Sequence, residues 1–381
     1  MRGDVATTFN PRVLLRDQLD GFITALGQDG REVLGPTIRD GAIQHDVVTS
    51  SRDLPVGMGD AQAPGQYRLV PRADAAVFGF TVGAQGLKKF FHAPQEQLFT
   101  VQREGRGLRF VPTPVTVRKL ALLGVRGCDL AALGVLDRVL LEDAYQDARY
   151  AARRSDVFIV AVHCGTSSSS CFCPSMGTGP RATQAWDLAL TELLEGQHRF
   201  LLEVGSDAGE TLVAALGLPH ASQQDVAAGT AVTTATAAGI TRSLDTNGLP
   251  AILQSAAEHA RWDDVASRCL TCTNCTLVCP TCFCTSLEDS TALDGTAQRT
   301  RQWDSCFTAD FSYLHGGEVR GSVKARYRQW LTHKLSTWQD QFGSLGCVGC
   351  GRCISWCPVG IDLTKEATLL REPSPPNKKE G

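Results

Sequence analysis

Residues 269–280 read CLTCTNCTLVCP, which chains four cysteines and a proline in the pattern C-x2-C-x2-C-x3-C-P. Residues 347–358 read CVGCGRCISWCP and repeat the same pattern. Three thiolates at this spacing wrap three corners of one iron–sulfur cube, and the proline turns the chain away after the fourth cysteine. In two-cluster ferredoxins that fourth cysteine ligates the cluster of the other run. The two runs therefore predict two [4Fe-4S] clusters and a chain that carries electrons.

Crossed ligation assigns four thiolates to each predicted cluster. The first cluster takes Cys269, Cys272, Cys275 and Cys357. The second takes Cys347, Cys350, Cys353 and Cys279. Structural zinc sites are the main alternative, but they typically separate two C-x2-C pairs rather than chain four cysteines. Disulfides are a further alternative for a cysteine-rich sequence. The chained spacing favours iron–sulfur clusters over both.

Composition narrows the class of protein. The chain has 381 residues, enough for two domains, and its 43% hydrophobic and 20% charged content is ordinary for a globular protein. A formal charge of −3 gives no electrostatic reason to expect nucleic acid as a partner. No membrane span and no secretory signal are expected, because no sufficiently long apolar run is present. Fifteen cysteines without an export signal indicate reduced thiols in the cytoplasm that serve as metal ligands.

The N-terminal part, residues 1–250, contains alternating strand and helix patterns. Apolar runs at Lys119–Val125, Val157–His163 and Arg199–Val204 predict buried strands. Asp129 is a candidate N-cap for a helix that follows the first of them. Strands that alternate with helices predict an α/β domain with at least a partly parallel sheet.

The C-terminal part, residues 251–370, is predicted to be an α-helical ferredoxin domain. Residues 251–268 read as a helix that leads into the first cysteine run. Apolar residues recur at three- and four-residue steps from Val323 to Trp338, which predicts helix between the two runs. We expect a helical hairpin to bring the runs together. The polar, proline-rich residues 371–381 predict a disordered tail.

Seven cysteines lie outside the two runs. Cys128 and Cys164 each follow a predicted buried strand, so parallel neighbouring strands would place both at the carboxyl edge of one sheet. Cys171 and Cys173 follow in a loop rich in serine and glycine. Two interpretations stay open for these four: a third metal or iron–sulfur site, or unligated thiols in a packed loop. The other three cysteines read as buried free thiols, or as weak hydrogen-bond donors to cluster sulfides: Cys282, Cys284 and Cys306.

Positive charge near a cluster raises its reduction potential. Arg352 lies inside the second run, and Lys334 lies in the segment between the runs together with several other basic residues. For most of these basic residues a solvated helix face is the simpler interpretation.

Further motifs accompany the cysteine runs. They are Cys279-Pro-Thr-Cys-Phe-Cys284, Trp303-Asp-Ser-Cys306, His333-Lys334, Gly124-Val-Arg-Gly-Cys-Asp129 and Cys171-Phe-Cys-Pro-Ser-Met-Gly-Thr-Gly-Pro180. With them, nearly the whole chain resembles the β subunit of cytoplasmic NAD(P)-linked [NiFe] hydrogenases, the sulfhydrogenases. The same family includes the iron–sulfur electron-transfer chain of anaerobic sulfite reductase.

The resemblance implies an electron-transferring subunit of an NAD(P)-dependent oxidoreductase complex. Its partners would be a flavin subunit that carries FAD and handles NAD(P)H, and the small and large subunits of a [NiFe] hydrogenase. The siroheme subunit of a sulfite reductase is the alternative acceptor. No G-x-G-x-x-G follows a strand, so the dinucleotide is expected on a partner, and no catalytic residue is expected in this chain. Two other classes are a redox-sensing binding protein and a self-contained reductase. The scattered histidines in residues 1–250 favour neither.

Overall fold

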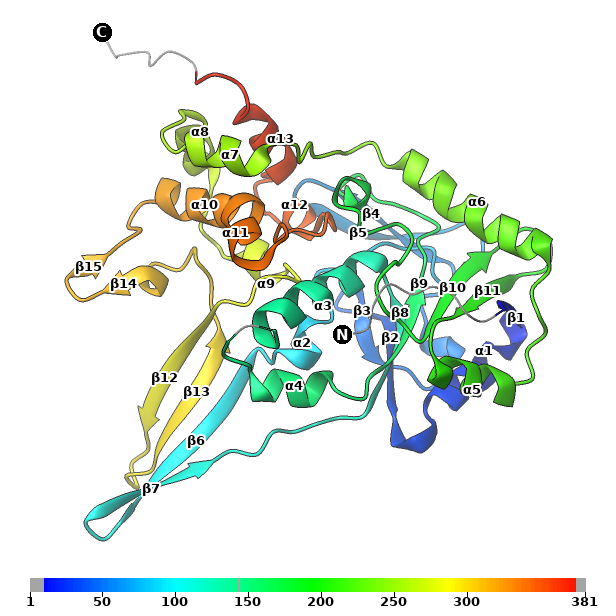
Figure 1. The fold of residues 1–381 in the computed structure, drawn as a ribbon, viewed down its shortest axis with the longest axis horizontal. Coiled ribbons are helices and arrows are strands. Elements are labelled where there is room, and N and C mark those ends of the chain that lie inside the picture. Colours follow the sequence, from blue (N-terminus) through cyan, green and yellow to red (C-terminus); the bar gives the residue numbers. More distant parts are fainter. Residues whose placement is uncertain (1–9, 143, 375–381) are drawn as a thin grey trace.

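The computed structural model describes residues 10–142 and 144–374, and a seven-stranded sheet forms the centre of its N-terminal part (Figure 1). The strand order is β1-β11-β10-β9-β8-β2-β3. Their bounds are β1 (Arg12–Leu15), β2 (Glu32–Arg39), β3 (Ala42–Val47), β8 (Leu120–Val125), β9 (Phe158–Val162), β10 (Leu188–Leu193) and β11 (Arg199–Val204). The inner strands β2, β8, β9 and β10 run parallel, whereas β1, β3 and β11 pair antiparallel. The predicted partly parallel sheet is confirmed.

Helices cover both faces of this sheet, which explains the continuous apolar runs of β8 and β9. Successive side chains of a strand point to opposite faces. Leu123 and Val160 accordingly belong to one apolar core and Leu122 and Ile159 to another. The first core includes residues of α1 (Leu19–Leu26) and α5 (Asp207–Ala215). The second includes residues of α2 (Lys88–Phe91), α3 (Gly127–Leu140) and α4 (Ala148–Arg154).

Helix α3 begins earlier than the sequence predicted. Its N-cap is Arg126, so Asp129 lies inside the first turn rather than at the cap. The Asp129 carboxylate instead pairs with Arg352 Nη2 at 2.8 Å, and both side chains are 2% exposed. Asp129 therefore connects the sheet to the second cysteine run.

A second sheet joins the two halves of the chain. Its order is β12-β13-β6-β7, with β6 (Gln95–Glu104), β7 (Gly107–Pro112), β12 (Thr285–Thr291) and β13 (Ala297–Trp303). Figure 1 shows it as an arm that projects away from the helices and the large sheet. Helix was expected between the cysteine runs, and for β12 and β13 that expectation is wrong. β12 pairs with β13, and β13 pairs with β6, which lies far away in sequence, so local periodicity does not reveal the sheet. This sheet also crosses the expected domain boundary at residue 250.

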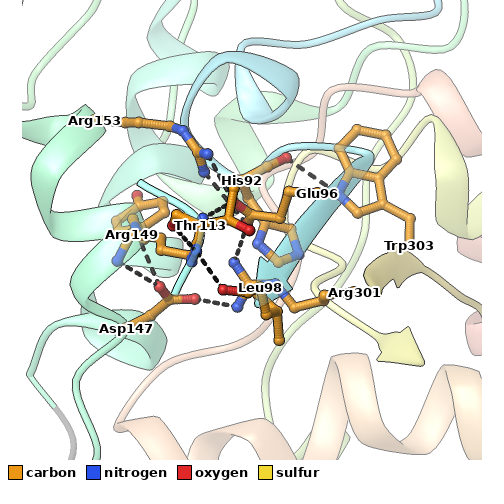
Figure 2. Close-up of polar contacts among 10 residues, drawn as sticks. His92, Glu96, Leu98, Thr113, Asp147, Arg149, Arg153, Arg301 and Trp303 are labelled. Atoms are coloured by element: carbon orange, nitrogen blue, oxygen red, sulfur yellow. Dashed lines mark hydrogen bonds and ion pairs between the residues drawn. The ribbon is translucent and has the colours of Figure 1, made fainter. Parts of the chain in front are cut away.

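The arm contacts α4 through one carboxylate that pairs with three arginines, as Figure 2 shows. Glu96 at the start of β6 pairs with Arg149 Nη1 at 3.1 Å, with Arg153 Nη2 at 2.7 Å and with Arg301 of β13. Burial alone would raise the pKa of Glu96, but the hydrogen bonds from Arg153 and Arg301 lower it to about 2. The group is charged at every physiological pH.

The C-terminal part is mainly helical. Its helices are α7 (Leu249–Ser255), α8 (Arg261–Arg268), α9 (Asn274–Leu277), α10 (Val323–Thr332), α11 (Trp338–Phe342), α12 (Arg352–Ser355) and α13 (Leu363–Leu369). A π-helical turn, His333–Thr337, joins α10 to α11, so the predicted helix from Val323 to Trp338 is confirmed. The single helix predicted for residues 251–268 is divided into α7 and α8. An apolar core around Trp262, Tyr327 and Leu331 supports this part.

The remaining α-helix is α6 (Gln223–Gly239), and the remaining strands form two hairpins, β4 (Met58–Ala63) with β5 (Gln66–Pro71) and β14 (Tyr313–Leu314) with β15 (Gly317–Glu318). The β4–β5 turn reaches the cluster region, because Gly65 N donates to the Ile354 carbonyl at 3.0 Å. Of the predicted disordered tail, residues 375–381 lie outside the described residues. Within the described ranges, no helix is long and apolar enough to cross a membrane.

Candidate metal centres

The structure brings together the four thiols assigned to the first predicted cluster. Cys269 is the C-cap of α8, Cys275 lies on α9, and Cys357 follows α12. One cavity is lined by Cys269, Cys272, Cys275 and Cys357, with Cys353 also at its wall. Burial raises the pKa of the Cys275 thiol, and the neighbouring thiols of Cys269 and Cys357 raise it further. The residue from the distant run therefore lies with the three from the local run.

The walls of this cavity are apolar. Phe307, Tyr327, Trp330 and Ile361 line it beside the cysteines. Two backbone amides point at the sulfurs: Thr271 N donates to Cys269 Sγ at 3.4 Å, and Ile361 N donates to Cys357 Sγ at 3.3 Å. Hydrogen bonds to ligand sulfurs and low solvent exposure are the means by which a protein tunes a cluster. The donor set and the apolar walls fit a [4Fe-4S] cluster.

The four thiols of the second predicted set also lie together. Burial raises the pKa of Cys353, and the thiols of Cys347, Cys279 and Cys350 then raise it further. The pKa of Cys347 is raised to about 12, again by burial first. Cys279, which belongs to the first run in sequence, is buried among the thiols of the second run. Each set therefore contains three cysteines of one run and one of the other.

Both runs have the same backbone conformation. Thr271 and Thr273 have φ of 50° and 66°, and Gly349 and Gly351 have φ of 65° and 75° at the corresponding positions of the second run. Left-handed residues on either side of the middle cysteine bend each run around a common centre. This conformation is costly for threonine, by about 1–2 kcal/mol per residue.

Two of the basic residues considered from sequence are buried at the second set. Lys334 Nζ donates to Cys279 Sγ at 3.3 Å, to Thr281 Oγ1 at 3.0 Å and to the Gly346 carbonyl at 3.0 Å. Arg352, paired with Asp129, has the thiol of Cys350 beside it. By contrast, the more exposed Lys324 and Arg328 pair with surface carboxylates.

Lys334 is therefore a buried cation held against a candidate ligand. All its hydrogen-bond partners are protein atoms of the interior, and its pKa is raised by the thiols of Cys279 and Cys282 despite burial, which acts the other way. Its periodic position in a predicted helix did not reveal this burial.

The cysteines at the sheet edge lie where the sequence placed them. β8 and β9 are parallel neighbours, Cys128 is in the first turn after β8, and Cys164 follows β9. Burial raises the pKa of Cys173, and the thiols of Cys164 and Cys171 raise it further. Burial also raises the pKa of Cys128, and the Asp129 carboxylate and the thiols of Cys350 and Cys173 raise it further. Whether these four bind metal stays a prediction.

The remaining three cysteines form a group that the sequence analysis did not assemble. Cys282 lies beside Cys279, and Cys284 lies beside Cys306. A hydrogen bond from Cys306 lowers the pKa of Cys284 to about 7, with further lowering by Lys334 and Lys88. Lys88 is buried, donates to the Cys282 carbonyl at 3.0 Å and stacks on the Trp303 ring at 3.9 Å. Neither the burial of Lys88 nor the pairing of Cys284 with Cys306 was indicated by a sequence pattern.

No group of three or more histidine, cysteine or acidic side chains within residues 10–142 and 144–374 converges on a single metal ion. Ligands of a single ion must meet at one point, about 2.3 Å from each sulfur for zinc. Cluster ligands instead bind separate irons at the corners of a cube.

Fold and site together define an iron–sulfur protein with a C-terminal dicluster domain. Residues 268–361 match the family described as a 4Fe-4S dicluster domain. The chain is 32% identical over 294 residues, or 75% of its length, to the sulfhydrogenase 2 subunit beta of Pyrococcus furiosus, of which 82% is covered. No solved structure matches significantly. The chain belongs to the family of hydrogenase β-type iron–sulfur subunits.

Proposed function

We propose that this chain relays single electrons through two [4Fe-4S] clusters between a [NiFe] hydrogenase module and a flavin-containing NAD(P)H oxidoreductase subunit. The observation that carries the proposal is the position of the two crossed cysteines: Cys357 lines one cavity with the first-run thiols, and Cys279 lies near the thiols of the second run. The family supports an electron-transfer role, since the matched relative belongs to a sulfhydrogenase. We also propose that residues 1–250 form an α/β domain that docks partner subunits, while residues 251–370 hold the clusters.

In this proposal the protein holds, insulates and tunes its cofactors. Cys269, Cys272, Cys275 and Cys357 would hold the first cluster. Cys347, Cys350, Cys353 and Cys279 would hold the second. Each cluster supplies one-electron redox chemistry when bound. The apolar rings around the first cavity would shield that cluster from water on their side, although Cys272 is exposed, and the Lys334 ammonium at Cys279 would stabilise added negative charge at the second.

Metal content tests the cluster assignment. Protein prepared anaerobically should contain at least about eight irons and eight sulfides, and Cys272→Ser should remove about four irons. A preparation with about four irons, or with stoichiometric zinc and no iron, would contradict the proposal.

Partner identity tests the place of the chain in a complex. Affinity purification of the native complex through this chain, followed by mass spectrometry, should recover a flavoprotein and a nickel-containing large subunit. Recovery of a siroheme protein instead would assign the chain to an anaerobic sulfite reductase, the alternative that shares the same family.

A further inference from the structure

We propose that Cys128, Cys164, Cys171 and Cys173 hold a third [4Fe-4S] cluster, located between the seven-stranded sheet and the second cysteine set. This inference rests on the proposed electron-transfer function and extends the relay by one site. No spacing motif indicates such a cluster, so the proposal depends on how the chain arranges these four thiols.

The fold places the cysteines near the carboxyl edge of the large sheet. Cys128 and Cys164 leave the same edge of the sheet, because β8 and β9 are parallel neighbours. Cys164 N donates to the Pro180 carbonyl at 3.1 Å, and Thr178 N donates to the Cys173 carbonyl at 3.1 Å. These bonds fold the loop back on its own start and hold Cys173 near Cys164.

The same loop packs directly on the second cysteine run. Phe172 N donates to the Gly349 carbonyl at 2.9 Å, and Thr178 Oγ1 donates to the Val348 carbonyl at 2.6 Å. Cys128 shares an apolar cluster with Val348 and Cys350. The proposed third site is thus next to Cys350, a candidate ligand of the second cluster, as a relay requires.

A buried cation beside Cys164 lacks a carboxylate partner. Arg126, the N-cap of α3, is 2% exposed. Its Nη2 donates to the Phe78 and Phe80 carbonyls at 2.9 and 3.0 Å, and its guanidinium lies 4.8 Å from the Phe80 ring centroid. Nε and Nη1 are buried without hydrogen-bond partners. Among the carboxylates of residues 10–142 and 144–374, none forms an ion pair with Arg126.

An unpaired guanidinium in the interior is costly unless an anion accompanies it. The Cys164 thiol lies beside Arg126. Four thiolates around an oxidised [4Fe-4S] core carry a net charge of −2, which would supply the missing anion. Transfer of one electron to such a cluster would form and break no bond, and Arg126 would stabilise the added negative charge.

Iron counting on the full chain tests the third cluster. Anaerobically reconstituted wild-type protein should contain about twelve irons and twelve sulfides. Cys173→Ser should lose about four irons, whereas the matched control Cys306→Ser, outside the proposed site, should lose none. Circular dichroism should show that both variants remain folded. Cys164→Ser, at a less buried position, provides a second removal if Cys173→Ser does not fold.

The outcomes separate the two proposals. Eight irons in the wild type, unchanged in Cys173→Ser, would overturn the third cluster and leave the proposed function intact. Eight irons with one zinc that is lost in Cys173→Ser would also overturn it, in favour of a structural zinc. Fewer than eight irons, insensitive to Cys272→Ser, would overturn the proposed function itself.

Discussion

The left-handed positions of the two cysteine runs carry threonine in one run and glycine in the other, and the reason is steric. A Cβ on Gly351 would lie 2.3 Å from the Ser170 carbonyl oxygen, and a Cβ on Gly349 would lie 2.7 Å from Cys173 Cα. The second run is pressed against the loop that contains Ser170. Thr271 and Thr273 belong to the less buried run, so their side chains are accommodated and only the backbone strain remains.

Gly351→Ala should therefore destabilise the protein more than a substitution at the corresponding left-handed position of the first run. We expect a loss of at least about 2 kcal/mol, from left-handed strain plus the contact with Ser170, and a lower iron content. Thr273→Ala, at the corresponding position, should change stability by less than about 1 kcal/mol. Thermal unfolding and iron analysis of both variants provide the comparison. Equal effects would refute the steric explanation.

The buried ammonium of Lys334 gives a prediction about redox potential. Lys334→Met removes a positive charge that lies 3.3 Å from Cys279 Sγ, so the reduced state of the second cluster becomes less stable. Its reduction potential should fall, while that of the first cluster should change less. Redox titration monitored by electron paramagnetic resonance measures both. Lys324→Met, which removes a more exposed cation that pairs with Asp263, should leave both potentials unchanged.

The two cysteine runs were recognisable in the sequence because a ligand run is a property of contiguous residues. The burial of Lys334 was not predictable in this way, since it depends on Cys279, 55 residues away. The same holds for the pairing of Cys284 with Cys306. Such contacts arise from tertiary packing, which overrides the local periodicity that placed the basic residues on a solvated helix face.

At the scale of elements, strands that are buried on both faces were the most predictable. β11 has the expected bounds Arg199–Val204, β8 begins one residue later than expected, and β9 is one residue shorter at each end. β12 and β13 were missed because they are polar and partly exposed, and they form strands by pairing with each other and, for β13, with the distant β6. The helix pattern of residues 323–338 was taken to hold for the whole segment between the cysteine runs, and so the helical prediction wrongly included β12 and β13.

The attachment of the β6–β13 arm depends on the Glu96 carboxylate. Glu96→Gln leaves Arg149, Arg153 and Arg301 without their shared anion, so we expect a loss of about 3 kcal/mol at neutral pH. Glu104→Gln is the matched control, since Glu104 lies on the same strand in an exposed pair with Arg109. Urea unfolding measures both variants, and similar losses would refute a special role for Glu96.

The pH dependence of this effect has a defined sign. Glu96 has a folded pKa of about 2 against an ordinary value of 4.5. A carboxyl with a depressed folded pKa contributes stability that is fully present above its unfolded pKa and is lost as the pH falls through the folded one. The difference between wild type and Glu96→Gln should therefore shrink as the pH is lowered from 4.5 towards 2. A constant difference over that interval would contradict the charge-based explanation.

At the scale of the whole molecule, the second cysteine set and the proposed third site lie where the two halves of the chain meet, whereas the cavity of the first set is lined by the C-terminal half. The carboxyl edge of the large sheet, the loop of residues 164–180 and the β4–β5 hairpin all contact the second cysteine run or α12. Arg352 crosses this junction through Asp129 and through the Gly83 carbonyl, to which its Nε donates at 2.8 Å. The domain boundary predicted at residue 250 separates these N-terminal segments from the second cysteine run, whereas in the structure they are in contact.

Crossed ligation makes the two runs depend on each other, and this can be tested one cluster at a time. Cys357 lies in the second run but lines the cavity of the first set, so Cys357→Ser should perturb the first cluster and largely spare the second. Cys279→Ser should do the reverse, because Cys279 lies among the thiols of the second set. Mössbauer and electron paramagnetic resonance spectra of the two variants distinguish the clusters, with Cys272→Ser and Cys350→Ser as references for uncrossed ligands. If Cys357→Ser reproduces the spectrum of Cys350→Ser instead of that of Cys272→Ser, each run holds its own cluster and the crossed arrangement is wrong.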